Sequence, residues 1–316
     1  MDPEPAANRA RPRLVTASVL CLLLAAALRL PSSDQLAVAL LGALAAPLAT
    51  IVAWMIVGSQ AAPWAGMLVA LSPIHSLVSR AAGPEAPLVL LLLAALWLML
   101  GLELDASPLR ATAVGFALGT LVASGVPGFA AVALVSLIWL TWRPERRALG
   151  ALAVLAAVAL VGTAALLGLA RSPFDYGEIP TWIPETTLEG VVRCAGASFT
   201  RVIGLEYQLV VPHARYVLPL SVLFVALMLR GAKRLPARPR GLLLAGASFP
   251  FALGAAMALI TGRVTPLQAN RLLAALPFVA LLTAAGLASL SGTRAWAAGT
   301  AVAGTLAVFL ALALGR

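Results

Sequence analysis

The side chains of this chain that could take part in chemistry gather in a few short segments between long apolar runs. Residues 70–87, ALSPIHSLVSRAAGPEAP, hold His75 and Arg80 among three prolines. A later segment, RVTPLQANR, carries Arg263 and Arg271 at its two ends. Arginine binds phosphate oxygens through two parallel hydrogen bonds, so both segments are candidates for holding a phosphate group.

Each of these residues also has a purely structural interpretation. Arg80 could anchor a helix end at lipid headgroups, because a long basic side chain keeps its charge in water while its stem stays in the apolar region. Arg263 and Arg271 could anchor two helix ends in the same way. A lone His75 at a helix end is usually structural. Glu85 could simply open the next helix, where a negative charge is favourable.

The remaining candidates are fewer and more scattered. The segment PHARY offers His213 and Arg215 beside Tyr216, and tyrosine is common at the surface of any membrane. Asp34, in PSSDQ, is the acid that lies between the first two apolar runs. Further acids of lower weight lie in residues 170–215: Asp175, Glu178, Glu185 and Glu206.

Metal and nucleotide chemistry have little support in the sequence. The chain has only 2 histidines, and no His, Cys and Asp residues cluster with the spacing of a metal site. We find no nucleotide-binding motif and expect no cofactor. GFALGT is not a phosphate loop but a stripe of small residues suited to close helix packing.

The elements that position these residues are helices in a membrane. Hydrophobic residues make up 61% of the 316 residues and charged residues 11%, whereas soluble domains are about a quarter charged. Long alternating polar and apolar segments, which a membrane barrel needs, are absent. Backbone groups in lipid must be satisfied internally, so the sequence predicts an all-α polytopic bundle.

The apolar runs predict about 11 transmembrane helices, since roughly 20 apolar residues cross a bilayer as a helix. Glycine and proline in ASGVPG predict a tight turn that joins the fifth and sixth helices as a hairpin. The expected segments are residues 14–30, 36–57, 61–77, 87–102, 111–123, 127–142, 149–169, 216–229, 241–260, 272–290 and 295–314.

The distribution of basic residues predicts a cytoplasmic N-terminus. With the N-terminus inside, the densely basic segments RPERR and RGAKRLPARPR both fall in short cytoplasmic loops. The basic residues behind the net charge of +10 are therefore explained by their role in setting the orientation in the membrane, and they give no reason to expect nucleic acid as a partner. RARPR and the first apolar run could also be a signal peptide, but we favour a retained first helix. We expect the 2 cysteines to form no disulfide.

This topology divides the chain into four parts. Residues 1–13 form a basic cytoplasmic N-terminus, residues 14–169 an N-terminal transmembrane bundle, residues 170–215 an extracytoplasmic loop, and residues 216–316 the C-terminal transmembrane helices. In the loop, Thr186 and Glu189 form a capping-box pattern that predicts an amphipathic helix with Leu188, Val191, Val192, Ala195, Phe199, Val202 and Ile203 on its apolar face. Such a helix could lie on the membrane surface or pack on the bundle.

Three segments of the chain resemble the GT-C membrane glycosyltransferases, the superfamily of protein O-mannosyltransferases and of bacterial lipid A aminoarabinose transferases. The segments are LRLPSSDQLAVALLGALAAPLATIVAW, ALSPIHSLVSRAAGPEAPLVL and RVTPLQANRLLAALPFVALLTAAGLASL. The order of the predicted elements is similar to that of the family over about three quarters of the chain. SPIH…SR and NRLLAALP carry most of it.

The resemblance implies an enzyme of the bacterial inner membrane that moves a sugar from a polyprenyl-phosphate donor to a lipid or glycan acceptor at the outer face. It implies Asp34 as the catalytic base, which must reach the acceptor hydroxyl. Basic groups on outer loops would hold the donor phosphate. The residues in that role would be His75, Arg80, His213, Arg215, Arg263 and Arg271.

The chain departs from the family pattern in its first outer loop. That loop is only PSSDQ, with Asp34 and Gln35 where the family has a long loop with an Asp-Glu pair. Two other functions therefore stay open. One is a non-catalytic protein of the same fold that assists a partner protein or binds a lipid-linked sugar. The other is a transporter of small molecules or lipids, although the expected spans carry no ionisable residue at their centres.

Overall fold

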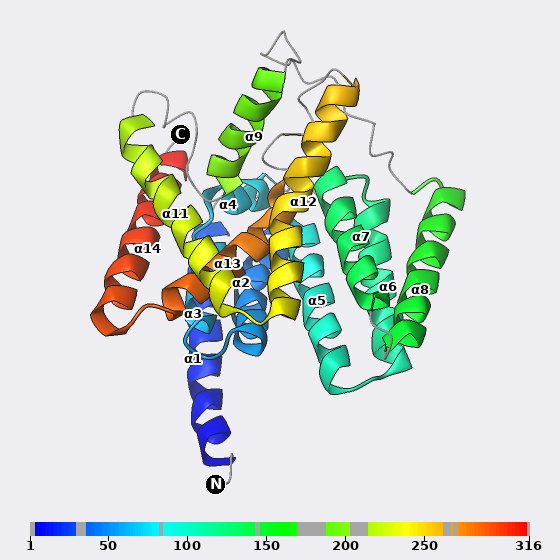
Figure 1. Cartoon of the computed structure of the whole chain (residues 1–316), viewed down its shortest axis with the longest axis horizontal. Coiled ribbons are helices and arrows are strands. Elements are labelled where there is room, and N and C mark those ends of the chain that lie inside the picture. The colour runs from blue at the N-terminus through cyan, green and yellow to red at the C-terminus, as the bar shows by residue number, and fades with distance from the viewer. Residues whose placement is uncertain are drawn as a thin grey trace.

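The structure is a computed structural model that describes residues 4–29, 36–81, 85–142, 146–169, 188–202, 214–261, 267 and 271–314. All regular elements of these residues are helices (Figure 1). They are α1 (Glu4–Arg29), α2 (Leu36–Ile56), α3 (Ala62–Ala70), α4 (Pro73–Arg80), α5 (Glu85–Leu104), α6 (Pro108–Ala123), α7 (Pro127–Thr141), α8 (Arg147–Leu166), α9 (Leu188–Val202), α11 (Ala214–Arg234), α12 (Ala237–Thr261), η5 (Leu273–Ala275), α13 (Leu276–Ala288) and α14 (Gly292–Leu314).

The helices have the length and composition of a membrane protein. Among the described residues, 5 helices are long and apolar enough to span a bilayer. They are α2, α5, α8, α12 and residues Gly292–Ala311 of α14. Shorter apolar helices are Leu14–Ala27, Pro108–Ala123, Pro127–Thr141 and Leu273–Ala288. The all-α class is confirmed, while the number of 11 spans and their orientation stay predictions.

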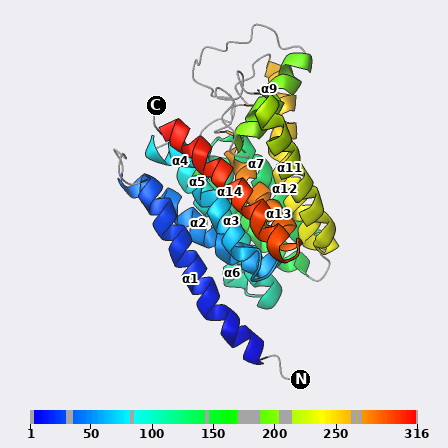
Figure 2. The ribbon, with the colours of Figure 1, turned by 90° about the vertical axis from the view of Figure 1, so that its left-hand side faces the viewer.

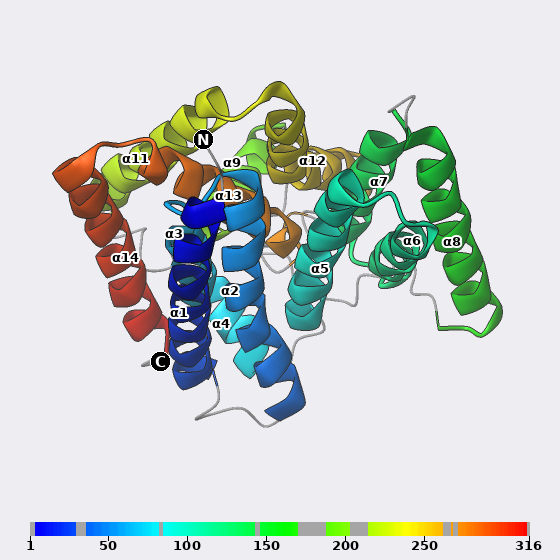
Figure 3. The same cartoon turned by 90° about the horizontal axis from the view of Figure 1, so that it is seen from below.

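The helices form two groups around a buried centre. The helices α5 to α8 pack against one another on one side, and α1 to α4 lie with α14 on the other (Figure 3). Between them runs α13, which contacts α3, α11 and α12. Every residue of α13 from Leu276 to Leu287 is buried, so this helix is the core of the bundle.

The hairpin and the small-residue stripe are both confirmed. A turn around Gly125, whose φ is 71°, joins α6 to α7; glycine adopts this left-handed conformation without a steric penalty. On α6, Gly115 and Gly119 lie directly against α8, and a Cβ on either glycine would meet the backbone of Ala153 or Ala157. The small residues therefore let the two backbones approach closely, as in other membrane helix pairs.

The third apolar run, expected as one span over residues 61–77, is broken in two. The helix α3 ends at Ala70, and α4 begins at Pro73 after Ser72. Pro73 has no N–H to continue the helix, and the Ser72 hydroxyl instead accepts a bond from the His75 backbone N–H at 3.4 Å. Figure 1 shows α4 lying across one end of the bundle instead of continuing α3.

The predicted helix of the long loop exists as α9, and it packs on the bundle. The ring of Phe199 meets Phe251 of α12 edge-to-face, with 5.7 Å between centroids, and Ser198 donates to the Leu267 carbonyl. Val191 and Val202 are buried as expected, but Val192 is 62% exposed and does not share their face. The capping pair itself involves Thr186, which lies outside the described residues.

The two ends of the bundle differ in charge. At what we call the basic end, the described helix ends carry Arg110, Arg146, Arg147, Arg230, Lys233, Arg234, Arg238, Arg240 and Arg294. At the opposite end, which we call the loop end, lie α4, the start of α5, the α6–α7 turn and Arg271. Figure 1 draws the basic end at the bottom, with the N-terminus, and the loop end at the top, with α4 and α9.

Candidate functional site

The loop end contains a fully buried arginine that was not among the expected site residues. Arg29, the last residue of α1, is 0% exposed. Its Nη1 donates to the carbonyls of Ala25 at 3.2 Å and Ala70 at 3.3 Å. Its Nη2 donates to the Val69 carbonyl at 3.2 Å and lies 3.1 Å from Nδ1 of His75. Arg29 thus joins α1 to both halves of the broken α3–α4 run.

The break in the third run explains why Arg29 is held there. Ala70 is the last residue of α3, so its carbonyl has no N–H partner within the helix, and the Val69 carbonyl accepts from the Ser72 backbone N–H at 3.4 Å. A guanidinium offers five N–H donors, and its positive charge is favourable at a helix C-terminus.

His75 is the partner of Arg29 on α4. Because Nδ1 faces a donor, the ring proton is assigned to Nε2. Nε2 has no hydrogen-bond partner among the described residues.

The helix α4 is amphipathic in the reverse sense to a soluble helix. Its buried residues are polar: His75, Ser76 and Ser79 are each 0% exposed. Ile74, Leu77 and Val78 are only partly buried. The Ser79 hydroxyl donates to the His75 carbonyl at 2.6 Å and lies against Gly42 of α2, where any Cβ would displace it. Polar groups that face the interior of an apolar bundle are a common mark of a functional site in membrane proteins.

The cations expected to bind phosphate take different positions at this end. Arg80 is the last residue of α4 and is half-buried. Arg271 precedes η5 and is also half-buried. Its backbone carbonyl lies against Gly128, at the start of α7, which fixes this late segment to the loop end. Residues nearly 200 positions apart in the sequence are therefore brought to one end of the bundle.

The other expected site residues are not placed by the structure. Asp34, Arg263 and His213 lie outside the described residues. Arg215 is in the first turn of α11, and its side chain is not described. Glu85, by contrast, opens α5 as expected and is 9% exposed. The catalytic base therefore stays a prediction.

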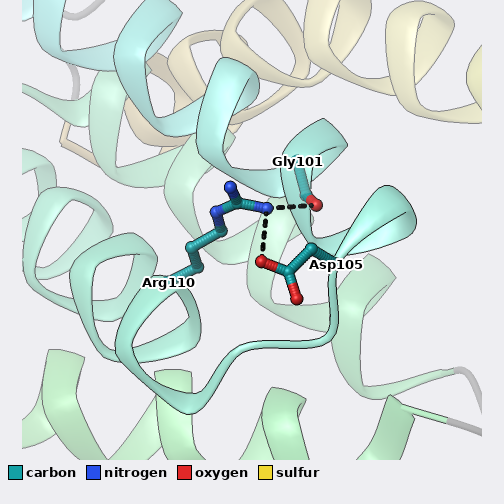
Figure 4. A network of polar contacts seen from close by, with 3 residues as sticks. All are labelled: Gly101, Asp105 and Arg110. Atoms are coloured by element: carbon teal, nitrogen blue, oxygen red, sulfur yellow. Dashed lines mark hydrogen bonds and ion pairs between the residues drawn. The ribbon is translucent and has the colours of Figure 1, made fainter.

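Arginines also cap helices at the basic end. Nη1 of Arg110 donates to the Gly101 carbonyl in the last turn of α5 at 3.0 Å and lies 3.1 Å from Oδ2 of Asp105 (Figure 4). Arg230 donates to the hydroxyl and the carbonyl of Ser289, just after α13. Arg110 and Asp105 are 41% and 64% exposed, so their ion pair contributes little to stability. Arg29 differs from both in being fully buried.

The described residues contain no group of three or more metal-ligating side chains. Comparison of the chain with protein-family models, curated proteins and solved structures finds no match. The family resemblance therefore rests on the sequence segments quoted above.

Proposed function

We propose that the chain is a membrane glycosyltransferase of the GT-C type that binds a polyprenyl-phosphate sugar at the loop end. The observation that carries the proposal is that Arg29, Arg80 and Arg271 all lie at that end, where the short helix α4 has a buried polar face. All three cations lie on the segments that resemble the family. The donor is a lipid, so its phosphate would meet the protein at the membrane surface, where helix ends lie.

The parts have distinct roles in this proposal. Arg80 and Arg271 hold the two oxygens of the donor phosphate and stabilise the charge that develops as the sugar leaves. Arg29 and His75 do not touch the donor; they hold α4 in place by fixing it to α1 and to the end of α3. Asp34 takes the proton of the acceptor hydroxyl. With the basic end in the cytoplasm, this site lies on the extracytoplasmic face of the inner membrane of a bacterium.

A transfer assay tests this function directly. Purified protein in liposomes would be given a panel of polyprenyl-phosphate sugars together with lipid and glycan acceptors, and release of the free polyprenyl phosphate would be measured. We expect turnover by the wild type and its loss in Asp34→Asn. Arg147→Gln, which changes an exposed arginine at the basic end, is the matched control and should keep full activity. Turnover that is unchanged in Asp34→Asn would remove Asp34 from the mechanism.

One observation favours transport as a second candidate. Discontinuous helices such as α3 and α4 often form the binding sites of secondary transporters. Substrate uptake into the same liposomes, without release of polyprenyl phosphate, would favour this function over transfer. Binding of the lipid-linked sugar without either activity would favour the non-catalytic alternative, a protein that presents the sugar to a partner.

A further inference from the structure

A cavity of about 610 Å³ opens at the basic end, far from the site described above. It lies between the N-terminal half of α1, the α2–α3 connection and the start of α14. Its wall includes Trp54, Trp64 and Trp296, and its rim includes Ser59 and Gln60. The volume is within the range of about 300–1,000 Å³ that small-molecule pockets occupy.

The cavity continues as an apolar groove along α1. The groove has a volume of about 500 Å³, and it shares Ala17, Pro63 and Met67 with the cavity. From there it follows Leu20, Cys21 and Leu24 toward the C-terminal end of α1. Figure 2 shows α1 and α14 on the same side of the bundle, and α3 contacts both. The lining of the groove is almost entirely apolar, as a hydrocarbon chain requires.

The mouth of the cavity has the character of a membrane interface. Trp64 and Trp296 meet edge-to-face with 5.6 Å between ring centroids, and Trp296 is 70% exposed. Tryptophan is enriched where the hydrocarbon region meets the headgroups. Ser59 and Gln60 supply hydrogen-bonding groups at the same level. The polar end of a ligand would lie here, and its tail would extend into the groove.

The charges around the mouth select the headgroup. Arg294 is exposed in the first turn of α14, next to Ala295 and Trp296, which line the cavity. No acidic residue is among those that line the cavity in the described part of the chain. Arg294 therefore gives the start of α14 a positive charge, which attracts an anionic headgroup.

We propose that this cavity binds an anionic phospholipid of the surrounding bilayer, with its phosphate near Arg294 and one acyl chain in the groove beside Cys21. This site is separate from the proposed donor site, because it lies at the opposite end of the bundle and uses none of the same residues. The lipid would fill the space between α1 and α14 and hold these two helices to α3.

The experiment uses the full-length protein and phospholipids with brominated acyl chains, which quench nearby tryptophan. We expect saturable quenching with phosphatidylglycerol at an affinity several-fold above that for phosphatidylcholine. Arg294→Gln should weaken phosphatidylglycerol binding about fivefold, the effect of about 1 kcal/mol for one basic residue near an anionic surface. Arg147→Gln, an exposed arginine at the start of α8, is the matched control and should change nothing.

A second pair of variants tests the cavity itself. Ala17→Phe places a ring where cavity and groove meet and should remove most of the saturable quenching, whereas Ala151→Phe on the exposed face of α8 should not. Equal quenching by both lipids, or quenching that survives Ala17→Phe, would overturn the proposal. A dimer that forms in place of lipid binding and shields the tryptophans would overturn it too. None of these results tests the proposed sugar transfer, because the variants leave Arg80 and Arg271 unchanged.

Discussion

At the scale of single residues, arginine has two kinds of place in this chain. Arg29, Arg110 and Arg230 each donate to carbonyls at the C-terminal end of a neighbouring helix. Such carbonyls have no partner within their own helix, and lipid offers no water to replace one. Arg80 and Arg271 instead hold half-buried positions at the loop end. The first kind holds the fold together, and the proposed donor site uses the second.

Replacing Arg29 by methionine should therefore destabilise the protein without removing any ligand contact. The Val69 and Ala70 carbonyls and the His75 ring would lose a charged donor, at a cost of about 3 kcal/mol in the free energy of unfolding. Thermal unfolding in detergent measures the change. Arg230→Met, which removes an exposed cap, should cost less than about 1 kcal/mol. Equal losses in the two variants would contradict the role given to Arg29.

At the scale of elements, the sequence predicted what depends on composition and local pattern. The apolar runs, the turn at Gly125 and the stripe of Gly115 and Gly119 all follow from residue type and spacing, and the structure has them. The break at Ser72 was missed because the apolar run continues across it. Pro73 inside that run was the available signal, since a proline ends or kinks a helix.

The burial of Arg29 was missed for a related reason. An arginine at the end of an apolar run usually extends to the headgroups, and nothing in its own segment says otherwise. It is buried because it donates to carbonyls at the end of α3. Those carbonyls belong to another segment of the chain, and they are exposed to Arg29 only because the helix breaks at Ser72. The position of α9 against Phe251 depends in the same way on contacts that no local pattern contains.

The pairing of α6 with α8 gives a prediction at this scale. Gly119→Val would force side-chain atoms into the Ala157 backbone and should lower the free energy of unfolding by about 2 kcal/mol or more. Gly162→Ala, on α8 where nothing lies within 4 Å of the added Cβ, should be neutral or slightly stabilising. Unfolding in detergent compares the two. A tolerated Gly119→Val would mean that α6 and α8 do not pack as described.

At the scale of the whole molecule, a group of nine described basic residues lies at the end of the bundle opposite the proposed donor site. The nine described cations of the basic end lie on helix ends opposite α4, α9 and Arg271. Basic loops favour the cytoplasmic side, so this separation predicts which end faces the cell interior. It also puts the proposed donor site and the proposed lipid cavity on opposite sides of the membrane.

Cysteine accessibility tests this orientation. In a background of Cys21→Ser and Cys194→Ser, a cysteine in place of Lys233 should be protected from an impermeant thiol reagent in intact cells. A cysteine in place of the exposed Val192 of α9 should be labelled. Labelling of the first variant alone would reverse the topology and place the Arg80 site in the cytoplasm.

The central claim is that the loop end holds a lipid-linked phosphate, and binding of polyprenyl phosphate to the purified protein tests it most directly. We predict saturable binding that weakens about tenfold or more in Arg80→Gln and again in Arg271→Gln, because each removes a charge-assisted contact of about 1.5–3 kcal/mol. Arg147→Gln, at the basic end, should bind as the wild type does. Equal binding by all four proteins, or none by the wild type, would contradict the claim.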